Sequence, residues 1–139
     1  NITLDKNLKE INYGDAEGLS YEELKKQFPQ IIKKWNEEKD PKFPSGESLN
    51  DVNKRLNNFI KNKISSNKSD IGKSILIFTH NVILRCLIGN IYKIKKSKWH
   101  KINIDYFNLM ELELRKNCLL SNIDRKKYYS LFKNFYKNN

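Results

Sequence analysis

The pattern of hydrophobic and polar positions predicts short helices in the first third of the chain. Residues 1–19 show no helical period and are expected to be irregular. Ser20, followed three residues later by Glu23, is a capping box and predicts the start of a helix. Pro29 suits the first turn of a second short helix, and two prolines within residues 40–46 predict a loop.

The clearest amphipathic helix is predicted behind Ser48, which suits the N-cap position. Its hydrophobic positions recur at helical spacing and form one stripe, made by Leu49, Val52, Leu56, Phe59, Ile60 and Ile64. The opposite face is rich in asparagine and lysine. Residues 65–74 are then expected to form a polar connector.

The most informative stretch is the apolar run over residues 75–79, which ends directly at His80. A continuous apolar run of this length predicts a strand buried on both faces, and a helical pattern follows over residues 81–92. Open α/β sheets place their ligand crevice at the carboxyl ends of their strands. Because the N-terminus of a helix also attracts negative charge, the pattern predicts an anion site at His80, most simply for phosphate.

The last third of the chain predicts a short helix and a hairpin. Residues 95–102 fit one or two helical turns, while residues 106–114 alternate with a strand period and lead into a second strand over residues 118–123. The tail from Asp124 has a helical pattern. Helix, strand, helix and hairpin together indicate an α/β sandwich, and the length fits one domain over residues 1–139.

Composition limits the partners that we expect. The net charge of +11 suggests nucleic acid, but the lysines are scattered and form no stripe interleaved with aromatic residues, so we expect no nucleic-acid partner. No apolar run approaches the roughly 20 residues of a membrane span, so we expect no membrane partner. Cys86 and Cys118 lie in apolar segments without metal-ligand spacing, which predicts reduced core residues of a cytoplasmic protein and no metal site.

Three segments in order carry a resemblance to a known family. Residues 8–18 read L-x-E-x-x-x-G-x-x-E-G, residues 44–55 read P-x-G-E-S-x-x-D-x-x-x-R, and residues 75–85 are similar to a strand followed by S-H-G-x-x-x-R. Each segment alone is a weak signal, but together they cover nearly the whole chain. In this combination the chain resembles the histidine phosphatase superfamily, the phosphoglycerate mutase-like enzymes.

The resemblance implies a three-layer α/β sandwich of the phosphoglycerate mutase-like type and phosphoryl transfer through a phosphohistidine intermediate, without a cofactor. It assigns His80 to binding the phosphoryl group and stabilising its charge, a role that suits a histidine near neutral pH. It assigns Glu10 to protonating the leaving alcohol. We expect Asn81 and Tyr13 to bind substrate.

Departures from the family pattern predict that this chain is an N-terminally incomplete fragment. The family's nucleophile is the histidine of an Arg-His-Gly strand, whereas the only histidines here, His80 and His100, do not follow an arginine. We therefore expect about two βα units to be absent and the chain as given to be inactive. Smaller departures are Thr79 for serine, Asn81 for glycine and Ala16 for tryptophan.

The residues alone leave other roles open. Without the resemblance, His80 would as often be a core histidine as a site residue. Glu10 would in most cases be a solvated acid in a loop. Residues 46–48 would form only a turn and an N-cap. Arg85 is either a phosphate ligand or, as is more common, a member of a structural ion pair. His100 has no partner motif and is expected to fill surface or core space.

We expect a phosphatase that acts on a small phosphomonoester, with the substrate or free phosphate as its partner. The segment between Gly18 and Pro44 lacks the arginine- and proline-rich insertion expected of the cofactor-dependent mutase. A phosphoglycerate mutase and a non-catalytic relative that binds phosphorylated ligands or a protein remain the alternatives. An absent central strand would expose an apolar sheet edge, which favours a homodimer, an exchange of elements or marginal stability.

Overall fold

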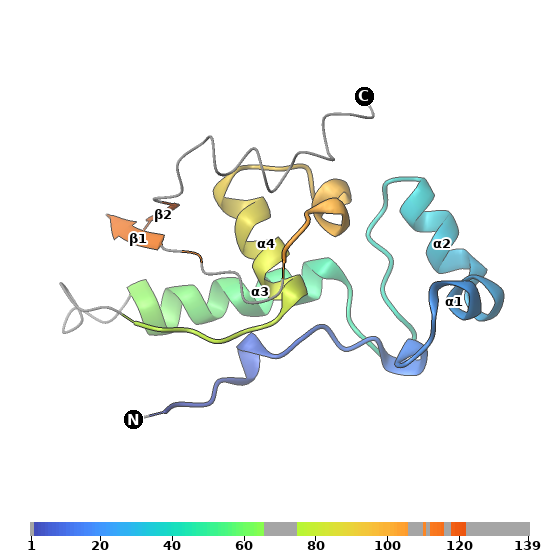
Figure 1. The fold of residues 1–139 in the computed structure, drawn as a ribbon, viewed down its shortest axis with the longest axis horizontal. Coiled ribbons are helices and arrows are strands. Elements are labelled where there is room, and N and C mark those ends of the chain that lie inside the picture. The colour runs from blue at the N-terminus through green and yellow to red at the C-terminus, as the bar shows by residue number, and fades with distance from the viewer. Residues whose placement is uncertain (1, 66–74, 106–109, 111, 116–117, 122–139) are drawn as a thin grey trace.

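The computed structural model describes residues 2–65, 75–105, 110, 112–115 and 118–121 (Figure 1). Most of the expected polar connector, the first part of the expected hairpin and the tail that was expected to be helical lie outside these residues. The described part is mainly helical.

The first third of the chain folds as its local pattern predicts. Two 3-10 turns, η1 (Lys6–Leu8) and η2 (Gly14–Ala16), interrupt an otherwise irregular segment. Helix α1 (Tyr21–Gln27) begins at the predicted capping box, in which Ser20 and Glu23 bond reciprocally. Helix α2 (Pro29–Asn36) has its proline in the first turn. The capping box and both helices are therefore confirmed.

Two longer helices form the centre of the molecule. Helix α3 (Leu49–Phe59) starts at a second capping box and continues as a π-helical segment, η3 (Ile60–Ser65). Helix α4 (Asn81–Ile91) packs against α3, and the 3-10 helix η5 (Lys96–Lys101) packs against α4 (Figure 1). Their buried hydrophobic side chains form the core: Val52, Leu56, Phe59, Val82, Ile83, Cys86, Ile88 and Trp99. None of the described helices has the length and hydropathy to cross a membrane.

The predicted hairpin is present. Strands β1 (Leu112–Arg115) and β2 (Cys118–Ser121) pair antiparallel, with Arg115 opposite Cys118. They are the two strands that the described residues contain.

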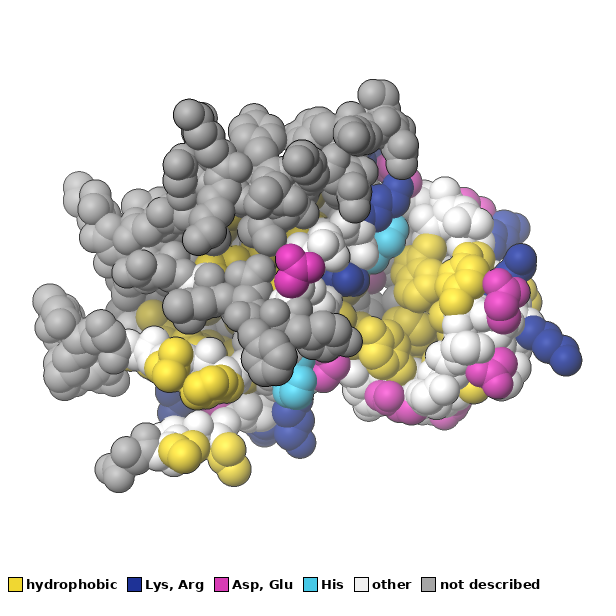
Figure 2. Space-filling model, in the orientation of Figure 1, with side chains coloured by type: hydrophobic (Ala, Val, Ile, Leu, Met, Phe, Trp, Pro, Cys, Tyr) yellow, Lys and Arg dark blue, Asp and Glu magenta, His cyan; other side chains and the backbone are white. Residues whose placement is uncertain are grey.

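The prediction of a buried strand over residues 75–79 is wrong for the structure described. These residues form no strand, and their side chains are largely exposed, from 41% for Ile77 to 85% for Phe78. Ile2 and Leu4 are also exposed, and hydrophobic side chains lie at the surface in this region (Figure 2). A strand is stabilised by hydrogen bonds to a neighbouring strand, and no described segment pairs with residues 75–79. The three-layer sandwich is accordingly not confirmed.

Gly89 on α4 is expected to be sensitive to substitution because Trp99 packs directly on it. A Cβ atom at Gly89 would lie 2.1 Å from Nε1 of Trp99. The indole is 2% exposed and is fixed by a hydrogen bond of 2.9 Å from Nε1 to the carbonyl oxygen of Ile94. Gly89→Ala should therefore lower the free energy of unfolding by about 1–3 kcal/mol, as overpacking typically does.

Urea denaturation of the purified chain measures this effect. Asn57→Ala is the matched control, because it also introduces alanine into a helix but at an exposed position. It should leave stability unchanged or raise it slightly. Equal stabilities of the two variants would show that α4 and η5 do not pack in this way.

Candidate functional site

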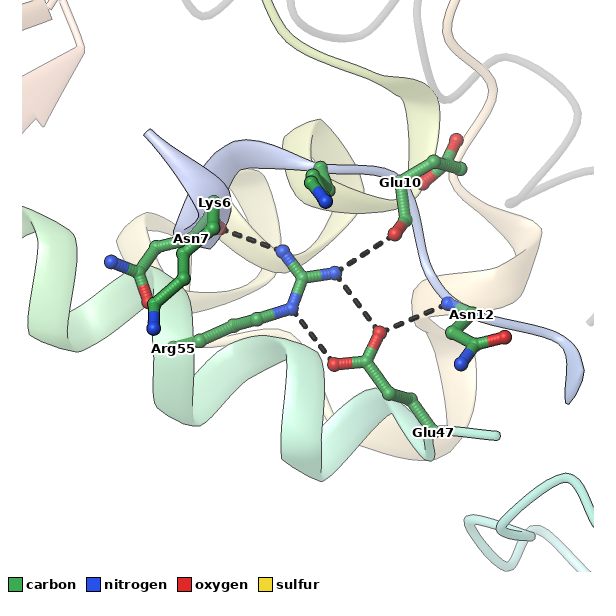
Figure 3. Close-up of a pocket in the computed structure, with 7 residues that line it drawn as sticks. Lys6, Asn7, Glu10, Asn12, Glu47 and Arg55 are labelled. Atoms are coloured by element: carbon green, nitrogen blue, oxygen red, sulfur yellow. Dashed lines mark hydrogen bonds and ion pairs between the residues drawn. The ribbon is translucent and has the colours of Figure 1, made fainter. Parts of the chain in front are cut away.

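Arg55 on α3 joins two of the three motif segments. Its Nε donates to Oε1 of Glu47 at 2.9 Å and its Nη2 donates to Oε2 at 3.1 Å, so that the pair is bidentate (Figure 3). Nη1 donates to the carbonyl oxygen of Asn7 at 2.7 Å, and Nη2 also donates to that of Glu10 at 3.0 Å. The side chains are only 16% and 24% exposed for Arg55 and Glu47. The guanidinium therefore fixes the backbone that carries Glu10.

The loops that carry Glu10 and Glu47 interlock. The N–H of Asn12 donates to Oε2 of Glu47 at 2.9 Å, and the N–H of Glu47 donates to the carbonyl oxygen of Asn12 at 2.8 Å. Gly14 has φ of +56°, and a Cβ atom there would lie 2.0 Å from the carbonyl oxygen of Pro44. Only glycine fits this close approach, which explains the glycine of the first motif.

The third motif segment meets the first at the N-terminus of α4. The carboxylate of Glu10 accepts from the N–H of Val82 at 3.2 Å and 3.4 Å, and from the N–H of Ile11 at 3.0 Å. His80 is the N-cap residue of this helix. Oγ1 of Thr79 donates to the carbonyl oxygen of Leu8 at 2.9 Å, which ties the two segments together. The structure thus brings Glu10 and His80 to one end of α4.

The two expected substrate-binding residues border the same region. Asn81 is exposed, and its Nδ2 donates to the carbonyl oxygen of Ile104 at 3.5 Å. Tyr13 is half-buried and meets the Phe43 ring edge-on, with centroids 4.9 Å apart. Burial raises the pKa of the Tyr13 hydroxyl, and the negative charge of Glu10 raises it further. Tyr13 therefore lies within electrostatic reach of Glu10.

A shallow pocket of about 350 Å³ opens beside the Arg55 contacts (Figure 3). It is lined by Lys6, Asn7, Lys9, Glu10, Asn12, Glu47 and Arg55. His80, Asn81 and Tyr13 are not part of this lining, so the pocket adjoins the α4 end of the site through Glu10 alone. No group of three metal-ligating side chains occurs among the described residues.

The arrangement brings three chemical groups with two capabilities to one helix end. An exposed imidazole and a helix N-terminus favour a bound anion, and a carboxyl group next to them can transfer a proton. What sequence reasoning missed is the Arg55–Glu47 pair that holds Glu10. Both residues belong to the motif segment over residues 44–55, which could have pointed to a contact between them. Their spacing of eight residues, however, differs from the three or four residues that separate paired side chains on a helix.

A family model for the histidine phosphatase superfamily (branch 1) matches residues 1–121. The chain therefore belongs to the histidine phosphatase superfamily, as the three motif segments predict. The match includes the stretches of Glu10 and His80.

Curated relatives include enzymes of different activity. Fructose-2,6-bisphosphatase of Saccharomyces cerevisiae is 29% identical over 111 residues, which are 79% of this chain and 23% of that protein. Phosphoserine phosphatase 1 of Hydrogenobacter thermophilus is 25% identical over 80% of this chain and 53% of its own length. The 2,3-bisphosphoglycerate-dependent phosphoglycerate mutase 2 of Gloeobacter violaceus is 25% identical over 73% of this chain and 47% of its own length.

A solved structure shares the fold. The YhfR protein of Bacillus stearothermophilus superimposes with a TM-score of 0.71 at 22% identity, over 86% of this chain and 59% of that one. The chain thus shares the fold of that protein over the aligned part, and it spans about half or less of the length of the curated relatives described above.

The Glu47–Arg55 pair should make stability depend on pH. Burial acts most strongly on Glu47 and raises its pKa, but hydrogen bonds from Arg55 and Asn12 together outweigh burial and hold the pKa below its ordinary value. The stabilisation is therefore present above the unfolded-state pKa of about 4.3 and is lost as pH falls through the lower folded-state value.

Urea denaturation between about pH 6 and pH 3 tests this expectation by comparing the chain with its Glu47→Gln variant. The variant should be less stable at the upper end of the range, and the difference should shrink towards the lower end. A stability difference that stays constant with pH would contradict the contribution of the Glu47 carboxylate.

Proposed function

We propose that this chain is part of a phosphomonoesterase that acts on a small phosphorylated metabolite through a phosphohistidine intermediate. The observation that carries the proposal is the meeting of Glu10 and His80 at the N-terminus of α4. Two of the relatives are named as phosphatases, which favours hydrolysis over the mutase alternative.

In the proposed reaction, His80 and the positive end of the α4 dipole attract the phosphoryl oxygens and offset their charge. A nucleophilic histidine forms a bond from nitrogen to phosphorus while the bond from phosphorus to the ester oxygen breaks. Glu10 gives its proton to the departing alkoxide, which leaves as the alcohol. Tyr13 and Asn81 contact the remainder of the substrate. Water then cleaves the phosphohistidine and releases phosphate.

The nucleophile is proposed to come from polypeptide beyond these 139 residues. We assign His80 to charge stabilisation, and His100 on η5 belongs to none of the three motif segments. The same missing segment would supply strands that pair with residues 75–79, bury their side chains and complete the three-layer sandwich. A second copy of the chain is the alternative source of a pairing strand.

The test is hydrolysis of an aryl phosphate by the purified chain and by a version extended upstream through an Arg-His-Gly strand. The short chain should show no significant turnover, because covalent catalysis collapses without its nucleophile. The extended protein should hydrolyse the ester and form an acid-labile phosphohistidine. Turnover by the short chain that His80→Ala abolishes would contradict the assignment, as would an inactive extended protein.

A further inference from the structure

The pocket of about 350 Å³ beside the Arg55 contacts is not used by the proposed reaction. Its volume lies within the usual range for small-molecule sites, which begins at roughly 300 Å³. The turn η1 and the segment behind it form one wall, and Glu47 and Arg55 form the other (Figure 3). Of the site residues at the end of α4, Glu10 alone contributes to this lining. The pocket therefore offers room for a ligand other than the substrate.

Positive charge dominates the pocket. Lys6 and Lys9 both line it, and the 3-10 geometry of η1 brings side chains three residues apart to the same face of the turn. Both lysines are exposed, and neither forms an ion pair within the described part of the chain. Arg55 and Glu47, by contrast, neutralise each other in their bidentate pair. The two ammonium groups are thus free to meet an anion.

Glu10 turns its backbone, and not its charge, toward Arg55. Its carbonyl oxygen accepts from Nη2 of Arg55 at 3.0 Å (Figure 3). Its carboxylate accepts from the N–H groups of Ile11 and Val82 and is therefore directed toward α4. An anion in the pocket would consequently meet the two lysines while the negative charge of Glu10 is engaged by N–H groups.

We propose that this pocket binds a small polycarboxylate, which acts as an effector and not as the substrate. Ammonium groups form strong charge-assisted hydrogen bonds with carboxylates, and a ligand with two or more carboxylates can engage Lys6 and Lys9 together. The side-chain amide of Asn12, which also lines the pocket, offers a further donor. Arg55, whose planar fork would suit a phosphate group, is already engaged by Glu47, which favours carboxylates over phosphate.

The inference goes beyond the proposed function, because it concerns a second ligand at a second site. A ligand that bridges the two lysines would tie down the turn η1, which Arg55 also holds through the carbonyl oxygen of Asn7. Glu10 follows directly behind this turn, so its position relative to α4 should become more fixed. Ligand binding should therefore slow the amide exchange of Val82, whose N–H donates to the carboxylate of Glu10.

The test is an NMR titration of citrate, which has three carboxylates, into the labelled 139-residue chain. Low ionic strength is used, because salt screens exposed charges. The amide signals of Lys9 and Asn12 should shift along one saturating curve. Acetate, with a single carboxylate, should bind about tenfold more weakly. Lys6→Gln and Lys9→Gln should each weaken the affinity for citrate by about fivefold.

Lys25→Gln is the matched control, because Lys25 is an exposed lysine of α1 and its replacement lowers the net charge equally. It should keep the full affinity for citrate, which would exclude a general effect of net charge. The amide signal of Asn81, the first residue of α4, reports on the phosphoryl site in the same spectra and should not follow the citrate curve of the pocket.

The proposal would be overturned if Lys9 and Asn12 showed no saturable shift, or if the affinity for citrate survived in both lysine variants. A shift of Asn81 along the same curve would place citrate at α4 and would equally contradict a second site. Saturable binding without slower amide exchange of Val82 would overturn the effect on Glu10. None of these results would affect the proposed function, which rests on the end of α4.

Discussion

Replacement of Glu10 by glutamine is expected to lower the turnover of the extended protein by about 100- to 10,000-fold, the usual contribution of a positioned general acid. Glutamine has nearly the shape of glutamate and keeps an oxygen that can accept from the N–H of Val82. The variant should therefore fold normally while lacking the proton that the leaving alcohol needs.

Substrate choice sharpens this test. An ester whose alcohol leaves readily without a proton, such as p-nitrophenyl phosphate, should lose far less rate than an alkyl phosphate. Glu22→Gln is the control, since Glu22 is an exposed residue of α1. Equal losses for both esters would mean that Glu10 positions the substrate and does not act as an acid.

Arg55→Ala is expected to have the largest effect on stability, lowering the free energy of unfolding by about 3 kcal/mol. The substitution leaves Glu47 without its bidentate partner and removes the donors to the carbonyl oxygens of Asn7 and Glu10. Removal of one partner from a largely buried ion pair costs more than the pair contributes, because the remaining charge stays desolvated.

Lys54→Ala is the matched control for this prediction, because Lys54 is the exposed neighbour of Arg55 on the same helix. It should change stability by less than about 0.5 kcal/mol. Amide hydrogen exchange of Ile11 and Val82, which face Glu10, should also accelerate in Arg55→Ala if Arg55 positions that residue. Equal stability of the two variants would contradict the role given to Arg55.

The elements that depend on local interactions were predicted well from the sequence. Ser20 and Ser48 begin helices because their side chains bond to N–H groups three residues ahead, which needs no distant partner. The antiparallel hairpin is equally local. By contrast, residues 75–79 were predicted as a buried strand from hydrophobicity alone, and a strand forms only where neighbouring strands accept its hydrogen bonds.

In the candidate site, too, local features were predicted from the sequence and contacts between distant segments were not. Its residue types followed from the motif segments, and the structure places Glu10 beside the helix that His80 begins. The supporting contacts could not be derived, because Arg55 reaches Asn7 across 48 positions of the chain. Arg85 was expected to be a phosphate ligand or, more commonly, part of a structural ion pair, and spacing gave no sign that its Nε atom is buried without a hydrogen-bond partner among the described residues. Such non-local contacts depend on how the segments pack against one another. The spacing of residues within a motif does not determine that packing.

The central claim, that a phosphoryl group binds at His80 and the N-terminus of α4, has a direct test in the 139-residue chain. Phosphate is titrated into the labelled protein while NMR follows the ring signals of His80, assigned with a His80→Gln variant, and the amide signal of Asn81, the first residue of α4. Both signals should shift together along one saturating curve, because imidazole and helix N–H groups would hold the same anion. Unchanged signals at phosphate concentrations of tens of millimolar would contradict the claim.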